Sequence, residues 1–375
     1  MTARARQMQA QGIDVISFAA GEPDFNTPRP IIDACEAALE KGMTKYAPSK
    51  GIPALVEAIV EKLEKENGIH SSGDNIVVSC GAKHSVYNAV MTVVEPGDEV
   101  ILLAPYWMTY ADQIRLAGGI PVVVHSTPES GFVPEIGAIQ EKISAKTKAI
   151  IVNSPNNPTG GAYGRQTLKE IAALAIRHNF WIISDEIYER LVYGHEHHSI
   201  AALGKEAADR TITVNGVSKT YSMTGWRIGY VCAPAPAAKA MANLQDQVTS
   251  NATTFAQAGA AAALKMPSEA VEEMRAIFES RRKLILDRIN AIPGIKAPEP
   301  LGAFYVFPDV SGLIGGEIKD DQALAEHLLD QAHIACVPGS IFEGDNCLRF
   351  SYAASPEDIN RGMDRLAEAA QRIRL

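Results

Sequence analysis

The chain has 375 residues, 46% of them hydrophobic and 21% charged, as expected for a globular protein of two or three domains with a large core. Its 44 acidic residues outnumber its 35 basic ones, and the formal net charge of −9 argues against a nucleic-acid-binding protein. No apolar run approaches the ~18 residues of a membrane-spanning helix, residues 1–11 lack the apolar region of a secretory signal, and the five scattered cysteines, never in a CxxC pair, indicate a reducing, cytoplasmic location without a zinc ribbon.

Short apolar runs alternate with helical patterns from about residue 75 to residue 233. The predicted strands are Asn75–Ser79, Glu99–Leu103, Ile120–Val124, Lys148–Val152, Phe180–Ser184, Thr211–Val214 and Ile228–Cys232. Helical patterns between them include His84–Val94, Glu135–Ile143 and Gln166–His178. This alternation predicts an α/β fold, with a mostly parallel sheet covered by helices on both faces.

The pattern changes after Pro236. The predicted helices there are Ala237–Val248, Thr254–Lys265, Ser268–Asn290, Gln322–Ala332 and Pro356–Ile373, and the predicted strands are Ala303–Phe307 and Cys347–Tyr352. These elements indicate a second, smaller α+β domain that is joined to the first through a long helix.

Several motifs of known chemistry are missing from the sequence. It has no GxxxxGK[ST] phosphate loop, no GxGxxG after a strand, no GxSxG elbow and no HExxH. The run His195-Glu196-His197-His198 offers imidazoles, but no matching set of carboxylate or Cys ligands is recognisable elsewhere. We interpret this run as a solvated loop and predict no metal site.

Ligands of α/β proteins lie beyond the carboxyl ends of the strands, so the residues that follow each predicted strand are candidates for a site. These positions hold Gly81-Ala82-Lys83 at a helix start, Trp107, a loop from Asn153 to Gly160, the pair Asp185 and Tyr188, and Ser218-Lys219. A helix start with small residues suits an anion, and a buried Asp needs a cationic partner. A lysine, a carboxylate, an amide, an aromatic ring and a phosphate pocket together suit pyridoxal 5'-phosphate held as a Schiff base.

The same motifs support a resemblance to a known family. The sequence contains FAAGEPDF at 18–25, KYAP at 45–48, NPTG at 157–160, SDEIY at 184–188, SK at 218–219 and GWRIG at 225–229. In this order, over nearly the whole chain, they resemble the class I aminotransferases of fold type I, and most of all the bacterial aspartate and aspartate/prephenate aminotransferases. The resemblance implies a large pyridoxal-phosphate-binding domain at 25–265 and a small domain formed by 1–24 plus 266–375.

The resemblance implies a role for each residue around the cofactor ring. Lys219 would form the Schiff base and move the substrate proton, and Asp185 would pair with the pyridine nitrogen. Tyr188 and Asn157 would bind the phenolic oxygen of the ring, and Trp107 would stack on its face. Each residue also has a plainer alternative. Lys219 could be a surface lysine, Asp185 a cap at the end of a strand, and Asn157 an ordinary turn residue. Tyr188 and Trp107 could simply pack in the core.

The phosphate group would be held by the turn Gly81-Ala82-Lys83 together with Ser218 and Arg227, the last through a charge-assisted fork. By the same resemblance, Tyr46 would reach across a homodimer to the phosphate of the partner's site. Two-fold symmetry would then place two sites at one interface.

For the substrate, Arg349 matches the family arginine that grips the α-carboxylate, and Gly21 would let the substrate approach the backbone. Trp107 and Asn157 would also contact the substrate. Lys83 stands where family members that use acidic substrates carry a lysine near the distal carboxylate, although its side chain could equally point to solvent.

The predicted function is therefore a ping-pong transfer of an amino group between an L-amino acid, aspartate above all, and a 2-oxo acid such as 2-oxoglutarate. The alternatives are an aromatic, prephenate or kynurenine-type transaminase, a pyridoxal phosphate lyase on the same fold, and, more remotely, a regulator that senses pyridoxal phosphate. Family members usually carry further residues before the helix expected near Thr2, and we expect an enzyme without that arm to differ in domain closure and substrate range.

Overall fold

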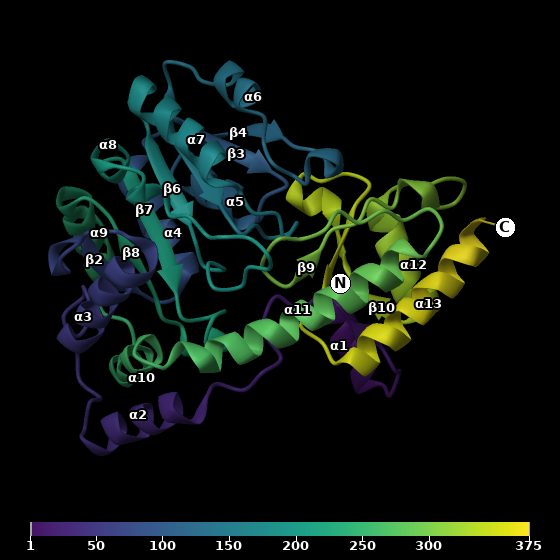
Figure 1. The fold of residues 1–375 in the computed structure, drawn as a ribbon, viewed down its shortest axis with the longest axis horizontal. Helices are drawn as coiled ribbons and strands as arrows, with labels where there is room; N and C mark the ends of the chain where they lie inside the picture. The colour runs from purple at the N-terminus through teal and green to yellow at the C-terminus, as the bar shows by residue number, and fades with distance from the viewer. Residues whose placement is uncertain (1, 375) are drawn as a thin grey trace.

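A seven-stranded sheet forms the centre of the larger part of the protein, in a computed structural model that describes residues 2–374 (Figure 1). The strand order is β2-β8-β7-β6-β5-β3-β4. The strands are β2 (Ile76–Ser79), β3 (Glu99–Ala104), β4 (Ile120–His125), β5 (Thr147–Asn153), β6 (Trp181–Asp185), β7 (Thr211–Gly216) and β8 (Gly229–Cys232). These are the seven strands predicted from the sequence, so the α/β class is confirmed.

Most neighbouring strands in this sheet are parallel. The pairs β3·β4, β3·β5, β5·β6 and β6·β7 run parallel, whereas β8 is antiparallel to both β7 and β2. Because β8 reverses between them, β2 runs in the same direction as β7. The carboxyl ends of β2, β3, β5, β6 and β7 therefore meet at one edge of the sheet.

Helices cover both faces of the sheet, since alternate residues of the strands are buried on opposite sides. One face packs on α4 (Ala82–Val93), α5 (Thr109–Leu116) and α9 (Ala235–Val248). The other face packs on α3 (Pro53–Lys62), α6 (Ile136–Glu141), α7 (Arg165–His178), α8 (Lys205–Ala208) and α10 (Thr254–Leu264). Helix α2 (Arg29–Glu40) lies against α10 (Figure 1).

The long helix α11 (Ser268–Asn290) runs from this layered part to a smaller group of elements near both ends of the chain (Figure 1). That group contains α1 (Thr2–Ala10), β1 (Ile16–Ser17), β9 (Tyr305–Val306), α12 (Asp321–Ala332), β10 (Ile334–Ala335), β11 (Val337–Pro338), β12 (Leu348–Ser351) and α13 (Pro356–Arg374). Strand β1 pairs in parallel with β10, and β12 lies between β11 and β9 in an antiparallel sheet. The two-residue strands β1, β10 and β11 were not predicted.

Short helical turns complete the connections. They are η1 (Leu63–Asn67, a π-helical turn), η2 (Gly73–Asn75), η3 (Pro128–Ser130), η4 (Ile200–Ala202), η5 (Thr224–Trp226), η6 (Ser311–Leu313) and η7 (Gly339–Phe342). No helix among residues 2–374 is long and apolar enough to cross a membrane.

Candidate active site

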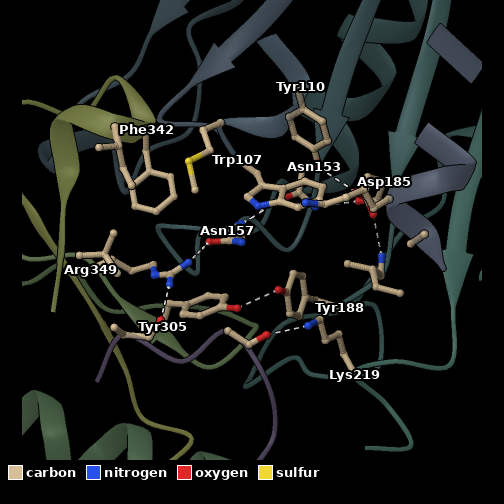
Figure 2. A pocket seen from close by; sticks show the side chains of 18 of the residues that line it. Trp107, Tyr110, Asn153, Asn157, Asp185, Tyr188, Lys219, Tyr305, Phe342 and Arg349 are labelled. Atoms are coloured by element: carbon tan, nitrogen blue, oxygen red, sulfur yellow. Dashed lines mark hydrogen bonds between the residues drawn. The ribbon is translucent and has the colours of Figure 1, made fainter. Parts of the chain in front are cut away.

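A cavity of about 660 Å³ lies at the carboxyl edge of the sheet, where residues of the small group of elements face it. Its volume suits a cofactor-sized ligand. Eleven of the thirteen residues predicted for the site line it: Gly21, Ala82, Lys83, Trp107, Asn157, Asp185, Tyr188, Ser218, Lys219, Arg227 and Arg349. The structure thus brings together residues that lie far apart in the sequence (Figure 2).

Asp185 is the last residue of β6 and is 3% exposed. Its Oδ2 accepts a hydrogen bond from the hydroxyl of Tyr110 at 2.7 Å, and its Oδ1 accepts one from the backbone N–H of Ile187 at 3.2 Å. Burial raises the pKa of Asp185 to about 6, against the lowering effect of the Tyr110 hydrogen bond. None of the ion pairs found among residues 2–374 includes Asp185, so this buried carboxylate lacks the cation that would balance its charge.

Lys219 follows β7, the strand beside β6, and lies below Asp185 in the view of Figure 2. Its Nζ donates a hydrogen bond to the carbonyl oxygen of Gly21 at 2.6 Å. Burial lowers the pKa of Lys219 to about 8, and the negative charge of Glu22 acts in the other direction. An amine with this pKa is partly unprotonated near neutral pH and can therefore act as a nucleophile or a base.

Arg349 lies on β12, at the side of the cavity formed by the small group of elements. It donates to Asn157 Oδ1 at 2.8 Å and to the carbonyl oxygen of Ala19 at 3.0 Å, and its guanidinium lies 4.6 Å from the ring centre of Tyr305. Its Nε is buried and finds no hydrogen-bond partner among the described residues. No ion pair with Arg349 is found among residues 2–374, so the guanidinium is available for a carboxylate from outside the chain.

Tyr188 stands between these groups. Its hydroxyl lies 2.9 Å from the hydroxyl of Tyr305, and burial raises its pKa well above the usual value for tyrosine. Tyr188 therefore stays protonated over the working pH range and can donate a hydrogen bond into the cavity. In Figure 2 the side chains of Tyr188, Asn157 and Tyr305 surround the space between Lys219 and Arg349.

A tight turn joins β2 to α4 at the edge of the cavity. Gly81 has φ +88°, and a Cβ there would lie 2.5 Å from Nη2 of Arg227, so only glycine lets the guanidinium rest against the turn. Arg227 itself has φ +58° and donates to the carbonyl oxygens of Thr224 and Cys80, at 2.9 and 3.3 Å. The first N–H groups of α4 have no partner within the helix. Together with Arg227, these N–H groups can bind an anion beside Ser218.

Trp107 and Lys83 form another wall of the cavity. The Nζ of Lys83 lies 4.7 Å from the ring centre of Trp107, and Trp107 packs edge-on against Tyr110. The Lys83 side chain is therefore directed along the cavity wall. Tyr46 lies outside the cavity and is 93% exposed.

The sequence analysis missed several residues of the site. Tyr110, Asn153, Tyr305 and Phe342 line the cavity, and Glu22 adjoins it through a hydrogen bond from Thr224 at 2.7 Å. Asn153 was detectable because it directly follows a predicted strand and begins the candidate loop, and its side chain donates to the carbonyl oxygen of Asp185 at 3.0 Å. Tyr110 and Tyr305 carry no such signal, since only the folded chain places their hydroxyls beside Asp185 and Tyr188.

One prediction was wrong. His197 does not lie in a solvated loop, because only 13% of its side chain is exposed and its Nε2 lies 3.0 Å from Oε2 of Glu186. The carboxylates that the sequence did not reveal are Glu186 and Glu189, whose oxygens come within 4.8 Å of the imidazole. Lys62 already forms an ion pair with Glu189, so this cluster carries its own cation.

The donor set of the cavity fits pyridoxal phosphate. Asp185 is a buried carboxylate without a cation, as a protonated pyridine nitrogen requires. The turn at Gly81 lets the Arg227 guanidinium lie against the start of α4, where an anion can bind. Lys219 is an amine with a lowered pKa between these two ends. The residues that could hold the group are therefore Lys219, Asp185, Tyr188, Asn157, Ser218 and Arg227.

Comparison with known proteins agrees with this geometry. Residues 13–366 match the family model described as aminotransferase class I and II. The chain is 48% identical to a probable aspartate/prephenate aminotransferase of Aquifex aeolicus, over all of this chain and 95% of the relative, and 46% identical to an aspartate aminotransferase of a Bacillus species, over 98% and 94%. Among solved structures, it is similar to the aspartate aminotransferase from Thermus thermophilus with maleate (43% identity, TM-score 0.94, 98% and 95% covered).

An aspartate aminotransferase from Rhizobium meliloti has the same fold, with a TM-score of 0.96, 39% identity and coverage of 99% and 95%. The match covers both the sheet and the small group of elements. The chain belongs to the aminotransferase class I and II family.

Proposed function

We propose that this protein is a pyridoxal-phosphate-dependent aspartate aminotransferase, which exchanges the amino group of aspartate with 2-oxoglutarate in two half-reactions. The observation that carries the proposal is that one cavity contains three groups suited to the cofactor and to an amino acid substrate. They are the amine of Lys219 with a pKa of about 8, the unpaired buried carboxylate of Asp185, and the guanidinium of Arg349 without a carboxylate partner.

Asp185 would hold the cofactor at its ring nitrogen, the cradle of Gly81, Ala82, Ser218 and Arg227 would hold its phosphate, and Lys219 would bind it between these two ends. When bound, pyridoxal phosphate supplies an aldehyde and an electron-withdrawing ring that lowers the energy of removing the proton from the substrate Cα. Asp185 favours that ring in its protonated form, because its charge is buried and otherwise unbalanced. Tyr188 and Asn157 would donate hydrogen bonds to the ring oxygen.

The remaining chemistry belongs to Lys219 and Arg349. Arg349 would bind the α-carboxylate of the amino acid by two parallel hydrogen bonds, which orients the Cα–H bond. Lys219, unprotonated and close to the Gly21 carbonyl, would take the proton from Cα of the amino acid substrate. In the second half-reaction it would return a proton to Cα of the amino acid product. The carbonyl of Gly21 and the face of Trp107 would limit the space for the substrate.

The choice of aspartate has two supports. The relatives of 46–48% identity carry the names aspartate and aspartate/prephenate aminotransferase, and the Thermus structure was solved with maleate, a four-carbon dicarboxylate. The side chain of Lys83 follows the cavity wall at Trp107, where a distal carboxylate could meet its charge. Prephenate is the second candidate substrate, because it appears in the names of several relatives.

We also infer a homodimer in which Tyr46 completes the partner's phosphate site. A tyrosine that is 93% exposed, next to a loop held by backbone and side-chain hydrogen bonds, supports this contact. We keep the predicted division into a large domain at 25–265 and a small domain at 1–24 plus 266–375, which the pairing of β1 with β10 supports. The five unpaired cysteines support a cytoplasmic location.

The absorption spectrum of the purified protein with added pyridoxal phosphate tests the proposal. We expect a visible band that changes when aspartate is added, and formation of oxaloacetate and glutamate in the presence of 2-oxoglutarate. A panel of amino acids with assay of the oxo-acid products distinguishes aspartate from aromatic or prephenate-type substrates. A protein that stays colourless with the cofactor would contradict the proposal.

A further inference from the structure

The turn that carries Asp185 and Tyr188 also carries two buried glutamates that point away from the cavity. Asp185 and Tyr188 face the cavity, whereas Glu186 and Glu189 do not line it and are only 2% and 6% exposed. Two buried carboxylates beside each other are expensive unless each has a cation and further hydrogen bonds. The structure supplies both.

Glu189 pairs with Lys62, the last residue of α3, which is itself 5% exposed. Asn67, at the end of η1, connects the two, since it accepts from Lys62 Nζ at 2.7 Å and donates to Glu189 Oε2 at 2.7 Å. One end of the turn is thereby tied to a different part of the large domain.

Glu186 has three close partners and a fourth, Asn67, which donates to its Oε2 at 3.5 Å. Ser184 donates to its Oε1 at 2.8 Å, Ser199 donates to its Oε2 at 2.5 Å, and Nε2 of His197 lies 3.0 Å from the same Oε2. Asn67 also donates to Ser199 at 2.8 Å, which joins this half to the Glu189 half. We call these six residues the turn-support cluster: Lys62, Asn67, Glu186, Glu189, His197 and Ser199.

The charges of the turn-support cluster balance only when His197 is protonated. Glu186 and Glu189 contribute two negative charges, and Lys62 supplies one positive charge. Glu66 lies 4.0 Å from Lys62 but is paired with Arg190 at 2.9 Å, so these two neighbours add no net charge. Burial acts to lower the pKa of His197, but the hydrogen bond and charge of Glu186 outweigh it, so that this pKa is raised above its ordinary value. A protonated His197 would make the set neutral.

We propose that His197 is a positioning residue of the aminotransferase site, which neutralises Glu186 and so holds the turn 185–188 in the geometry that presents Asp185 and Tyr188 to the cofactor. The proposal rests on the cofactor site described above. His197 does not line the active-site cavity, and it acts only through Glu186 and the backbone between the two faces of the turn. The cluster therefore adds little net stability compared with apolar packing, but it specifies one arrangement of the turn.

The test uses His197→Gln, Glu186→Gln and the double variant. His197→Gln leaves Glu186 as a buried carboxylate without a cation, and we expect the Kd for pyridoxal phosphate to rise roughly tenfold and kcat to fall, with less change in KM for aspartate. The double variant removes both charges and replaces them with two amides. We expect its cofactor affinity to return to within about threefold of wild type, as a coupled pair requires.

His195→Gln is the matched control, because His195 lies on the same loop, half-buried, without a contact to Glu186. We expect it to leave cofactor affinity unchanged. The inference is overturned if His197→Gln lowers the midpoint of urea unfolding but leaves cofactor affinity and kcat unchanged, if the double variant is no better than the single one, or if His195→Gln has the same effect. A wild-type protein that binds no pyridoxal phosphate would instead overturn the proposed function itself.

Discussion

The hydroxyl of Tyr110 donates a hydrogen bond of 2.7 Å to Oδ2 of Asp185, across 75 residues of sequence. Tyr110 is 1% exposed, and burial together with the charge of Asp185 keeps its pKa well above the usual value. The phenol therefore stays a donor and supports the ionised form of Asp185. No basic residue among those described forms an ion pair with Asp185. The position of a cation beside this carboxylate is therefore left to the ligand.

Replacement of Tyr110 by Phe removes this hydrogen bond without changing the shape of the ring. A hydrogen bond to a charged group contributes about 1.5–3 kcal/mol, so we expect the affinity for pyridoxal phosphate to fall roughly tenfold or more. Fluorescence titration of the cofactor-free protein measures the change. Tyr163→Phe is the control, since Tyr163 is buried but does not line the cavity. Equal losses in both variants would show that Tyr110 only packs.

Asp185→Asn should stabilise the cofactor-free protein at neutral pH while it abolishes turnover. Because burial raises the pKa of Asp185 to about 6, the folded protein binds a proton more tightly than the unfolded chain, whose carboxyl has a pKa near 3.8. The free energy of unfolding therefore decreases as the pH rises from below 3.8 to above 6. The shift corresponds to about 3 kcal/mol as an upper value.

Urea unfolding of both proteins at pH 3.5 and pH 7.5 checks this prediction. The difference in stability between Asp185→Asn and wild type should be larger at the higher pH. A wild-type protein that is the more stable of the two at pH 7.5, in the absence of cofactor, would contradict it.

The reaction of the cofactor-free protein with pyridoxal phosphate should accelerate with pH. Only the unprotonated amine of Lys219 attacks an aldehyde, and its pKa is about 8. We expect the rate to rise between pH 7 and pH 8 and to level off above pH 9, as followed by stopped-flow absorbance. Lys219→Ala should give no such reaction and no turnover, with a thermal unfolding midpoint close to wild type. A rate that is independent of pH would show that the amine is already neutral at pH 7.

Lys83→Ala tests the contact with a second substrate carboxylate. Its loss should raise KM for aspartate on the order of tenfold, because a charge-assisted hydrogen bond disappears. KM for alanine, which has no distal carboxylate, should change little. Steady-state kinetics with both amino acids measure the ratio, and equal effects on the two substrates would assign Lys83 to the phosphate turn or to solvent instead.

Hybrid dimers test the proposed reach of Tyr46. Tyr46→Phe should weaken cofactor binding several-fold if its hydroxyl meets the partner's phosphate. A hybrid of one Tyr46→Phe subunit and one Lys219→Ala subunit keeps one site with both the lysine and the partner's tyrosine. We expect that site to bind the cofactor as wild type does. A hybrid with the weaker affinity of the Tyr46→Phe homodimer would place Tyr46 in its own subunit's site.

Local sequence determined much of the architecture. All seven strands of the central sheet were predicted, with ends that differ by at most two residues, because each is a short apolar run between turn residues. Residues that follow these strands, such as Asp185 and Lys219, were predicted to meet, since the carboxyl ends of parallel strands share one edge. Strands β1, β10 and β11 were missed, because two residues are too few to show a pattern.

Only the tertiary structure decided which side chains support the site. Tyr110 and Tyr305 reach Asp185 and Tyr188 from 75 and 117 residues away, and His197 was assigned to solvent although it is paired with Glu186. Periodicity in a sequence reports which face of an element is buried, but it does not report the partner on the other side. The chemical groups of this protein could thus be identified from its sequence, whereas their charge balance and orientation depend on contacts between distant segments that form only when the chain folds.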